Sequence, residues 1–179
     1  FNISGLNEIE EKKLYDDFKI LKNGNIFFLS KKDISEIIYS YRTVEEFEID
    51  KIYPSTLNVE IKKTELLALT KKNGKDYFVG ANGNLIEIND NIPELPFIFG
   101  NLDIDNFLYL KKIIDISNFE FSYIKNLYYF KSKRWDILTK DGFILKMPNN
   151  LTVEKLNLIS KVIKNQNLEN AKLFDFRQN

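Results

Sequence analysis

The segment around Pro54 restricts what the first third of this chain can form. Proline has φ fixed at about −65° and no N–H group, so it belongs in a turn and not inside a paired strand. Apolar and polar residues alternate on both sides of this proline, at residues 47–50 and 57–61, as they do in half-buried strands. The pattern predicts a β-hairpin over residues 47–61.

Two helices are expected before this hairpin. Asn7 is a favourable N-cap, and Glu10 follows it at the spacing of a capping box. Residues 30–33 have the composition of a second cap, and apolar residues then recur with a helical period up to Tyr41. With a short strand at residues 1–6, the predicted order of elements is β-α-α-β-β.

The rest of the chain consists mainly of short apolar runs separated by turn signals. Asn82-Gly83 and Asp141-Gly142 are dipeptides typical of tight turns. Helices are expected after Asp103 or Asp105 and after Thr152, which are candidate N-caps. The expected strands span residues 66–70, 77–79, 85–88, 121–130, 135–139, 143–147 and 171–177.

This order of elements predicts an α+β protein with two domains. Residues 1–63 form the β-α-α-β-β domain, and residues 64–179 form a mainly antiparallel β-domain with two helices. A chain of 179 residues is long enough to bury two small cores.

The composition leaves few residues for chemistry. The sequence has no histidine and no cysteine, which removes the usual general base and the commonest zinc ligands. It also lacks the nucleophile-elbow, phosphate-loop and dinucleotide-binding motifs. The neighbouring acids Asp16-Asp17 and Glu45-Glu46 diverge on a helix or strand, and we interpret them as solvated surface. We therefore expect a protein that is not an enzyme, with no catalytic residue, cofactor or metal site.

Charge and hydropathy restrict the partners further. Lys and Arg number 26 and Asp and Glu also number 26, whereas nucleic-acid-binding surfaces carry a basic excess. No nucleic-acid partner is expected. No apolar run approaches the roughly 18 residues of a membrane-spanning helix, and no signal peptide is visible.

Several short segments carry a family resemblance through their order and spacing. They are Phe1-Asn2-Ile3-Ser4-Gly5-Leu6, Asn25-Ile26-Phe27-Phe28-Leu29-Ser30, Tyr53-Pro54-Ser55-Thr56-Leu57, Gly80-Ala81-Asn82-Gly83-Asn84-Leu85-Ile86, Leu95-Pro96-Phe97-Ile98-Phe99-Gly100, Trp135-Asp136-Ile137-Leu138, Gly142-Phe143-Ile144-Leu145-Lys146-Met147 and Ala171-Lys172-Leu173-Phe174-Asp175-Phe176-Arg177. Together they resemble the extracytoplasmic region of the bacterial cell-division family FtsQ/DivIB, a POTRA domain followed by a β-domain. The family usually has an acidic residue and then a proline in the strand leaving the hairpin, where this chain has Lys63 and Leu66.

The resemblance implies a non-enzymatic scaffold of the divisome, the cell-division machinery. Such proteins bind FtsB-like and FtsL-like partners, link early and late division proteins, and regulate septal peptidoglycan synthesis. Other division proteins are expected to bind through the POTRA domain. Family members are anchored in the bacterial cytoplasmic membrane by one helix ahead of the POTRA domain, with this region on the extracytoplasmic side at the septum. That helix is expected to have been removed from this chain, which begins at Phe1.

The terminal strand is the candidate partner-binding surface. A strand at the end of a chain often lies at a sheet edge, where unpaired N–H and C=O groups accept a partner strand. The candidate contact residues are Lys172, Leu173, Phe174, Phe176 and Arg177. If Lys172, Phe174 and Phe176 share one face, that face is either the domain core or a docking surface.

A basic cluster before Trp135 is the second candidate surface. Lys131, Lys133 and Arg134 either meet acidic groups on a partner or form an ordinary solvated strand end. Trp135 itself is expected in the core.

Two other functions are alternatives. One is a POTRA-containing protein of outer-membrane assembly or secretion, although the strands after residue 64 lack the sustained ten-residue spacing of a barrel. The other is a carboxylate-based envelope glycan-modifying enzyme, which needs a cleft with two acids about 5–10 Å apart.

Overall fold

The computed structural model of the chain describes residues 1–20, 30–52, 56–88, 92–165 and 172–177. These form two compact units, residues 1–66 with 80–86 and residues 67–79 with 87–179. In each unit, helices pack on one face of a sheet. Residues 25–29 of the family-like segment before the second helix, Pro54 of the predicted hairpin turn, and Ala171 of the predicted terminal strand lie outside the described residues.

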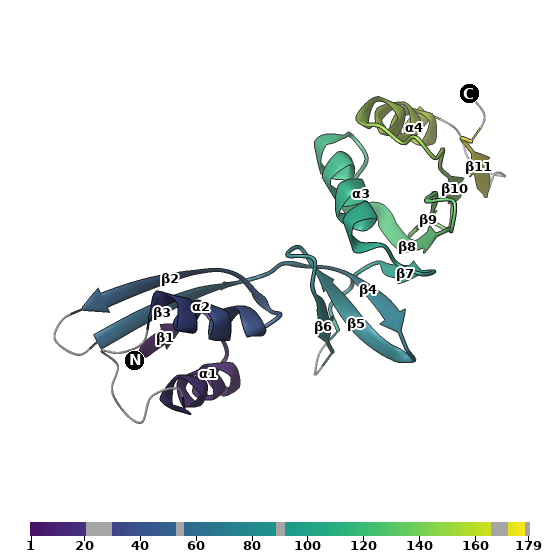
Figure 1. The fold of residues 1–179 in the computed structure, drawn as a ribbon. Coiled ribbons are helices and arrows are strands. Elements are labelled where there is room, and N and C mark those ends of the chain that lie inside the picture. The colour runs from purple at the N-terminus through teal and green to yellow at the C-terminus, as the bar shows by residue number, and fades with distance from the viewer. Residues whose placement is uncertain (21–29, 53–55, 89–91, 166–171, 178–179) are drawn as a thin grey trace. The chain divides into compact units, whose positions relative to one another are not determined.

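A three-stranded sheet with the order β1-β3-β2 and two helices on one of its faces form the first unit (Figure 1). The elements are β1 (Asn2–Ser4), α1 (Glu8–Ile20), α2 (Lys31–Ser40), β2 (Val44–Ile52) and β3 (Thr56–Lys63). Strand β3 pairs in parallel with β1 and antiparallel with β2. The predicted β-α-α-β-β order is confirmed.

The predicted caps start both helices of this unit. The Asn7 side chain accepts a hydrogen bond from the Glu10 N–H at 2.9 Å, and the Asn7 N–H donates to the Glu10 carboxylate at 3.2 Å. Ser30 and Asp33 form the same reciprocal capping box at the start of α2. These caps fix where each helix begins. The apolar residues of both helices pack against β3, whose alternating residues 57, 59 and 61 are buried.

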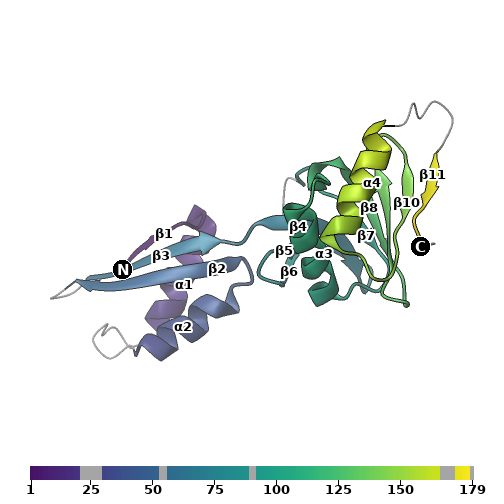
Figure 2. The same cartoon turned by 90° about the horizontal axis from the view of Figure 1, so that it is seen from above.

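The second unit contains most of an eight-stranded sheet with the order β11-β10-β9-β8-β7-β4-β5-β6, and residues 85 and 86 of the edge strand β6 are grouped with the first unit. Its strands are β4 (Leu66–Lys72), β5 (Lys75–Gly80), β6 (Leu85–Glu87), β7 (Phe97–Phe99), β8 (Ile124–Tyr129), β9 (Trp135–Thr139), β10 (Ile144–Lys146) and β11 (Leu173–Asp175). Helices α3 (Ile104–Ile116) and α4 (Val153–Asn165) lie on the same face of this sheet (Figure 2). The α+β class is confirmed, and three pairings, β4–β7, β7–β8 and β10–β11, are parallel.

The helix-covered face of this sheet is the core of the second unit. Leu127, Ile137 and Leu145 lie opposite one another on adjacent strands and are fully buried. Trp135 is 5% exposed, and its ring centroid lies 6.3 Å from that of Phe107 on α3. The prediction that Trp135 belongs to the core is confirmed.

One predicted strand begins later than expected. Residues Phe121–Tyr123 form a 3₁₀ turn, in which the Tyr123 N–H bonds to the Glu120 carbonyl at 3.1 Å. In a strand, these backbone groups would bond to a neighbouring strand. The prediction of a strand over residues 121–130 is therefore wrong for its first three residues. Of the two candidate caps of α3, Asp103 is the one that accepts a bond from the Asn106 N–H, at 3.2 Å.

The residue after β7 must be glycine. Gly100 has φ of +106°, and a Cβ atom there would lie 2.2 Å from the Tyr129 carbonyl oxygen. Gly142, in the β9–β10 turn, has a similar φ of +88°, but nothing lies within 4 Å of a Cβ built there. The two positions therefore share a backbone conformation and differ in available space.

The turn from Gly80 to Ile86 belongs to the first unit. The Asn82 side-chain amide donates to the Val44 carbonyl at 2.8 Å, and the Asn82 N–H donates to the Thr64 hydroxyl at 3.0 Å. The domain boundary after residue 63 stays a prediction. No helix among the described residues has the length and apolar character needed to cross a membrane.

Candidate functional site

Strand β11 forms one edge of the eight-stranded sheet, beside β10 (Figure 1). The Lys172 carbonyl accepts a hydrogen bond from the Ile144 N–H at 2.8 Å, and the Phe176 N–H donates to the Lys146 carbonyl at 2.9 Å. These bonds fix β11 parallel to β10 and set its register. The terminal strand therefore occupies an edge position.

The outer side of β11 carries backbone groups that face no other described strand. Alternate residues of a strand in a parallel pair bond to the same neighbour, so the N–H and C=O groups of Leu173 and Asp175 point away from β10. The next outward N–H, that of Arg177, donates to the Asp175 carboxylate at 3.1 Å. The open stretch is short, and Asp175 marks its end.

Two aromatic side chains, that of Phe174 in β11 and that of Phe176 just after it, lie on the helix-covered face. Phe174 is opposite the buried Leu145, and its ring centroid is 5.8 Å from that of Phe143. The Phe176 ring stacks on Phe174 at 6.2 Å. Both rings are half-buried, so they extend the core to the sheet edge and keep part of their surface exposed.

Leu173 lies on the opposite, helix-free face. It is 51% exposed and is paired with Ile144, which is 40% exposed. Leu138 on β9 continues this row behind Ile144. An apolar row on the helix-free face thus ends at the open edge.

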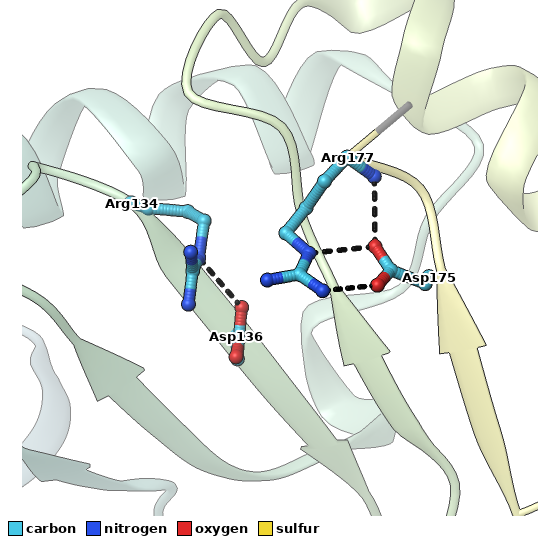
Figure 3. Close-up of polar contacts among 4 residues, drawn as sticks. All are labelled: Arg134, Asp136, Asp175 and Arg177. Carbon is cyan, nitrogen blue, oxygen red and sulfur yellow. Dashed lines mark hydrogen bonds and ion pairs between the residues drawn. The ribbon is translucent and has the colours of Figure 1, made fainter. Parts of the chain in front are cut away.

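Four charged side chains meet on the helix-free face near the end of β11 (Figure 3). The Arg177 guanidinium donates to the Asp175 carboxylate through Nε at 2.7 Å and through a second nitrogen. Arg134 Nε donates to Asp136 Oδ1 at 3.2 Å. Figure 3 shows the Arg177 guanidinium between the carboxylates of Asp175 and Asp136, and both acids raise the pKa of Arg177, chiefly through the hydrogen bond with Asp175.

The Asp175–Arg177 pair predicts a measurable titration. The Arg177 hydrogen bond holds the pKa of Asp175 well below its ordinary value of 3.8. Because the folded-state pKa is depressed, any stability from this pair is present above about pH 4 and is lost as the pH falls through the lowered pKa. Substitution Arg177→Gln should return the pKa of Asp175 toward 3.8, as followed by carboxyl carbon NMR. Lys172→Gln is the control and should leave it low; an ordinary pKa in the unsubstituted protein contradicts the ion pair.

The three residues of the predicted basic cluster lie in different surroundings. Lys131 and Lys133 are exposed in the turn between β8 and β9. Arg134 is half-buried, with its guanidinium carbon 4.4 Å from the centroid of the Phe130 ring, and it pairs with Asp136. The structure therefore places Arg134 beside Asp136 and leaves Lys131 and Lys133 exposed, and partner binding by these three residues stays a prediction.

The sequence patterns did not single out the two carboxylates beside Arg134 and Arg177. Asp136 and Asp175 each pair with an arginine two positions away, Arg134 and Arg177. Side chains two residues apart in extended backbone share a face, so an acid in a predicted strand with an arginine two positions away is the signal that points to both pairs.

Two family models together match most of the chain. The model described as POTRA domain, FtsQ-type, matches residues 1–64, and the model described as Cell division protein FtsQ/DivIB, C-terminal, matches residues 68–177. This chain belongs to the FtsQ/DivIB family of cell-division proteins. The predicted family is confirmed, and a role in cell division follows from it.

Curated FtsQ/DivIB proteins are similar over most of the chain. DivIB of Staphylococcus aureus (strain NCTC 8325 / PS 47) is 28% identical over 151 residues, DivIB of Clostridium botulinum (strain Hall / ATCC 3502 / NCTC 13319 / Type A) is 27% identical over 176, and FtsQ of Rickettsia bellii (strain RML369-C) is 23% identical over 180. The matches cover 79%, 98% and 98% of this chain and 34%, 59% and 67% of those proteins. The chain thus spans only part of the length of these relatives.

A solved FtsQ/DivIB structure is also similar. It is the major extracytoplasmic domain of the trans isomer of DivIB from Geobacillus stearothermophilus, with a TM-score of 0.41 and 14% sequence identity. The match covers 59% of this chain and 98% of that domain.

Proposed function

We propose that this chain is the extracytoplasmic scaffold region of a divisome protein, and that it binds an FtsB-like partner, together with an FtsL-like partner, by strand addition at β11. The observation that carries the proposal is the open edge, where Leu173 and Asp175 direct backbone groups away from the sheet. Each main-chain hydrogen bond gained there contributes about 1 kcal/mol net, and side chains flanking the edge supply specificity.

The charged cluster would adjust the length of the added strand. Asp175 occupies both the Arg177 guanidinium and the Arg177 N–H. A partner carboxylate that took over the guanidinium would allow Asp175 to release that N–H, and the open edge would then continue to residue 177. Arg134, which shares the same face through Asp136, would provide a second cation for the partner.

The role at this edge is to hold partners in place without chemical turnover. In the whole protein, a membrane anchor ahead of the POTRA domain would place this region on the extracytoplasmic side at the septum. There it would link division proteins and regulate septal peptidoglycan synthesis, with further divisome proteins bound through the POTRA domain. Family membership favours this role over outer-membrane assembly, secretion or glycan modification.

Truncation after Asn170 tests the proposal. We expect the intact chain to bind a synthetic peptide from the host's FtsB-like protein with micromolar or tighter affinity in calorimetry, and the truncated chain to lose this binding. The truncated chain must retain the circular dichroism of the intact one, because loss of fold would also abolish binding. Absence of binding by the intact chain contradicts strand addition at β11.

A further inference from the structure

A pocket of about 330 Å³ lies in the second unit where the end of α4, the β9–β10 turn and the loop before β8 meet. Its apolar walls are the side chains of Phe119, Tyr123, Phe143 and Ile163. A volume of this size falls at the lower end of the range for sites that enclose small ligands or single side chains. Three of the four apolar walls are aromatic rings, which favour a cation over their faces.

The charged groups of the pocket are mainly acidic. Glu120 and Asp141 contribute carboxylates and Lys164 contributes one ammonium group. Neither acid forms an ion pair with any side chain in the described ranges of the chain. Two carboxylates against one ammonium group leave a net negative charge beside the aromatic walls, which suits a positively charged guest.

Hydrogen bonds hold the pocket in place. Burial raises the pKa of Tyr123, and its hydrogen bond with Asp141 raises it further. The hydroxyl therefore stays protonated at neutral pH and orients the Asp141 carboxylate. The Ser160 hydroxyl donates to the Asn118 carbonyl at 3.0 Å, and this bond ties α4 to the loop that carries Phe119 and Glu120. These two bonds link the segments that line the pocket.

The pocket adjoins β11 through one aromatic contact. Phe143 lines the pocket, and the same ring contacts Phe174 of β11. A side chain from a polypeptide paired with the outer side of β11 would have to extend across Phe174 to reach the pocket on the helix-covered face. We propose that the pocket receives a lysine or arginine side chain from the polypeptide that adds to β11, so the source of the side chain rests on the proposed function.

The bound side chain would divide its contacts by chemistry. Its methylene groups would lie against Ile163 and Phe119, because long basic side chains bury their stems on apolar surface. Its charged end would lie over the Tyr123 and Phe143 rings and reach the two carboxylates. A partner strand with a basic residue at this position would therefore bind more tightly than one with a neutral residue.

NMR titration with a small probe tests the pocket without any partner. N-acetyl-arginine methylamide should shift the amide signals of residues lining the pocket in a saturable manner. Its uncharged isostere, N-acetyl-citrulline methylamide, should bind at least about five-fold more weakly, given the modest strength of exposed cation–π contacts and ion pairs. The double variant Glu120→Gln with Asp141→Asn should remove this preference, and Asp105→Asn, an exposed acid on α3, should keep it.

A second arm separates the pocket from the edge. In calorimetry, the double variant should bind the host FtsB-like peptide about five-fold more weakly than the unsubstituted chain. Truncation after Asn170 should abolish this binding. Equal binding of the two probes, or no response to arginine, overturns the pocket and leaves strand addition intact. A pocket that prefers arginine in a chain that binds no peptide overturns the partner as the source of the side chain.

Discussion

Replacement of Leu173 by proline should lower the affinity for the FtsB-like peptide at least about ten-fold while the second unit stays folded. The Leu173 N–H points away from β10, so proline removes no hydrogen bond of the sheet, and edge positions of this kind tolerate proline. The substitution does remove one donor from the partner's ladder, and the pyrrolidine ring occupies the space through which a partner strand approaches. Calorimetry with the peptide measures the loss.

Leu173→Ala is the matched control for this prediction. Alanine at this position removes most of the exposed side chain but keeps the backbone N–H group. The comparison therefore separates the effect of backbone pairing from the effect of the apolar row that Leu173 shares with Ile144. We expect Leu173→Ala to lose much less affinity than Leu173→Pro. Equal losses in the two variants would show that the side chain, and not the strand edge, makes the contact.

Replacement of Gly100 by alanine should lower the free energy of unfolding of the second unit by about 3 kcal/mol or more. Part of this loss is the cost of a positive φ in a residue with a Cβ atom. The larger part comes from overlap with the Tyr129 carbonyl, 2.2 Å away, which forces β7 and β8 apart next to their parallel pairing. Urea denaturation followed by circular dichroism measures the change.

Gly142→Ala isolates the two contributions. The φ of Gly142 is also positive, and a Cβ atom there meets nothing within 4 Å, so only the conformational cost of about 1–2 kcal/mol applies. The difference between the two alanine variants is the steric contribution. If both variants lose the same stability, the close approach at Gly100 is relieved by a small shift of the backbone.

Local sequence signals predicted the parts of the fold that depend on neighbouring residues. Asn7, Ser30 and Asp103 cap helices because a short polar side chain satisfies backbone N–H groups within its own turn. The alternation at residues 57–61 likewise predicted which side of β3 is buried. These features need no knowledge of the rest of the chain.

Contacts between distant segments were beyond the sequence patterns. The three-residue strand β7 lies between β4 and β8 and is parallel to both, and no periodicity in so short a strand records its neighbours. The parallel pairing of β11 with β10 depends on α4, which carries the chain back across the sheet. This pairing brings the two local acid–arginine pairs, Arg134 with Asp136 and Asp175 with Arg177, to one surface, and their spacing in the sequence does not show that they lie together.

Trp135 gives the second unit its own optical signal. It is the only tryptophan in the sequence, and it is buried against Phe107 and Tyr129, with ring centroids 6.3 and 4.5 Å away. Its fluorescence therefore follows the packing of the second unit alone, whereas the amide backbone of both units absorbs in the far ultraviolet. The order in which the two units lose structure can be read from one unlabelled sample, by comparing the emission of a single indole with the signal of the whole backbone.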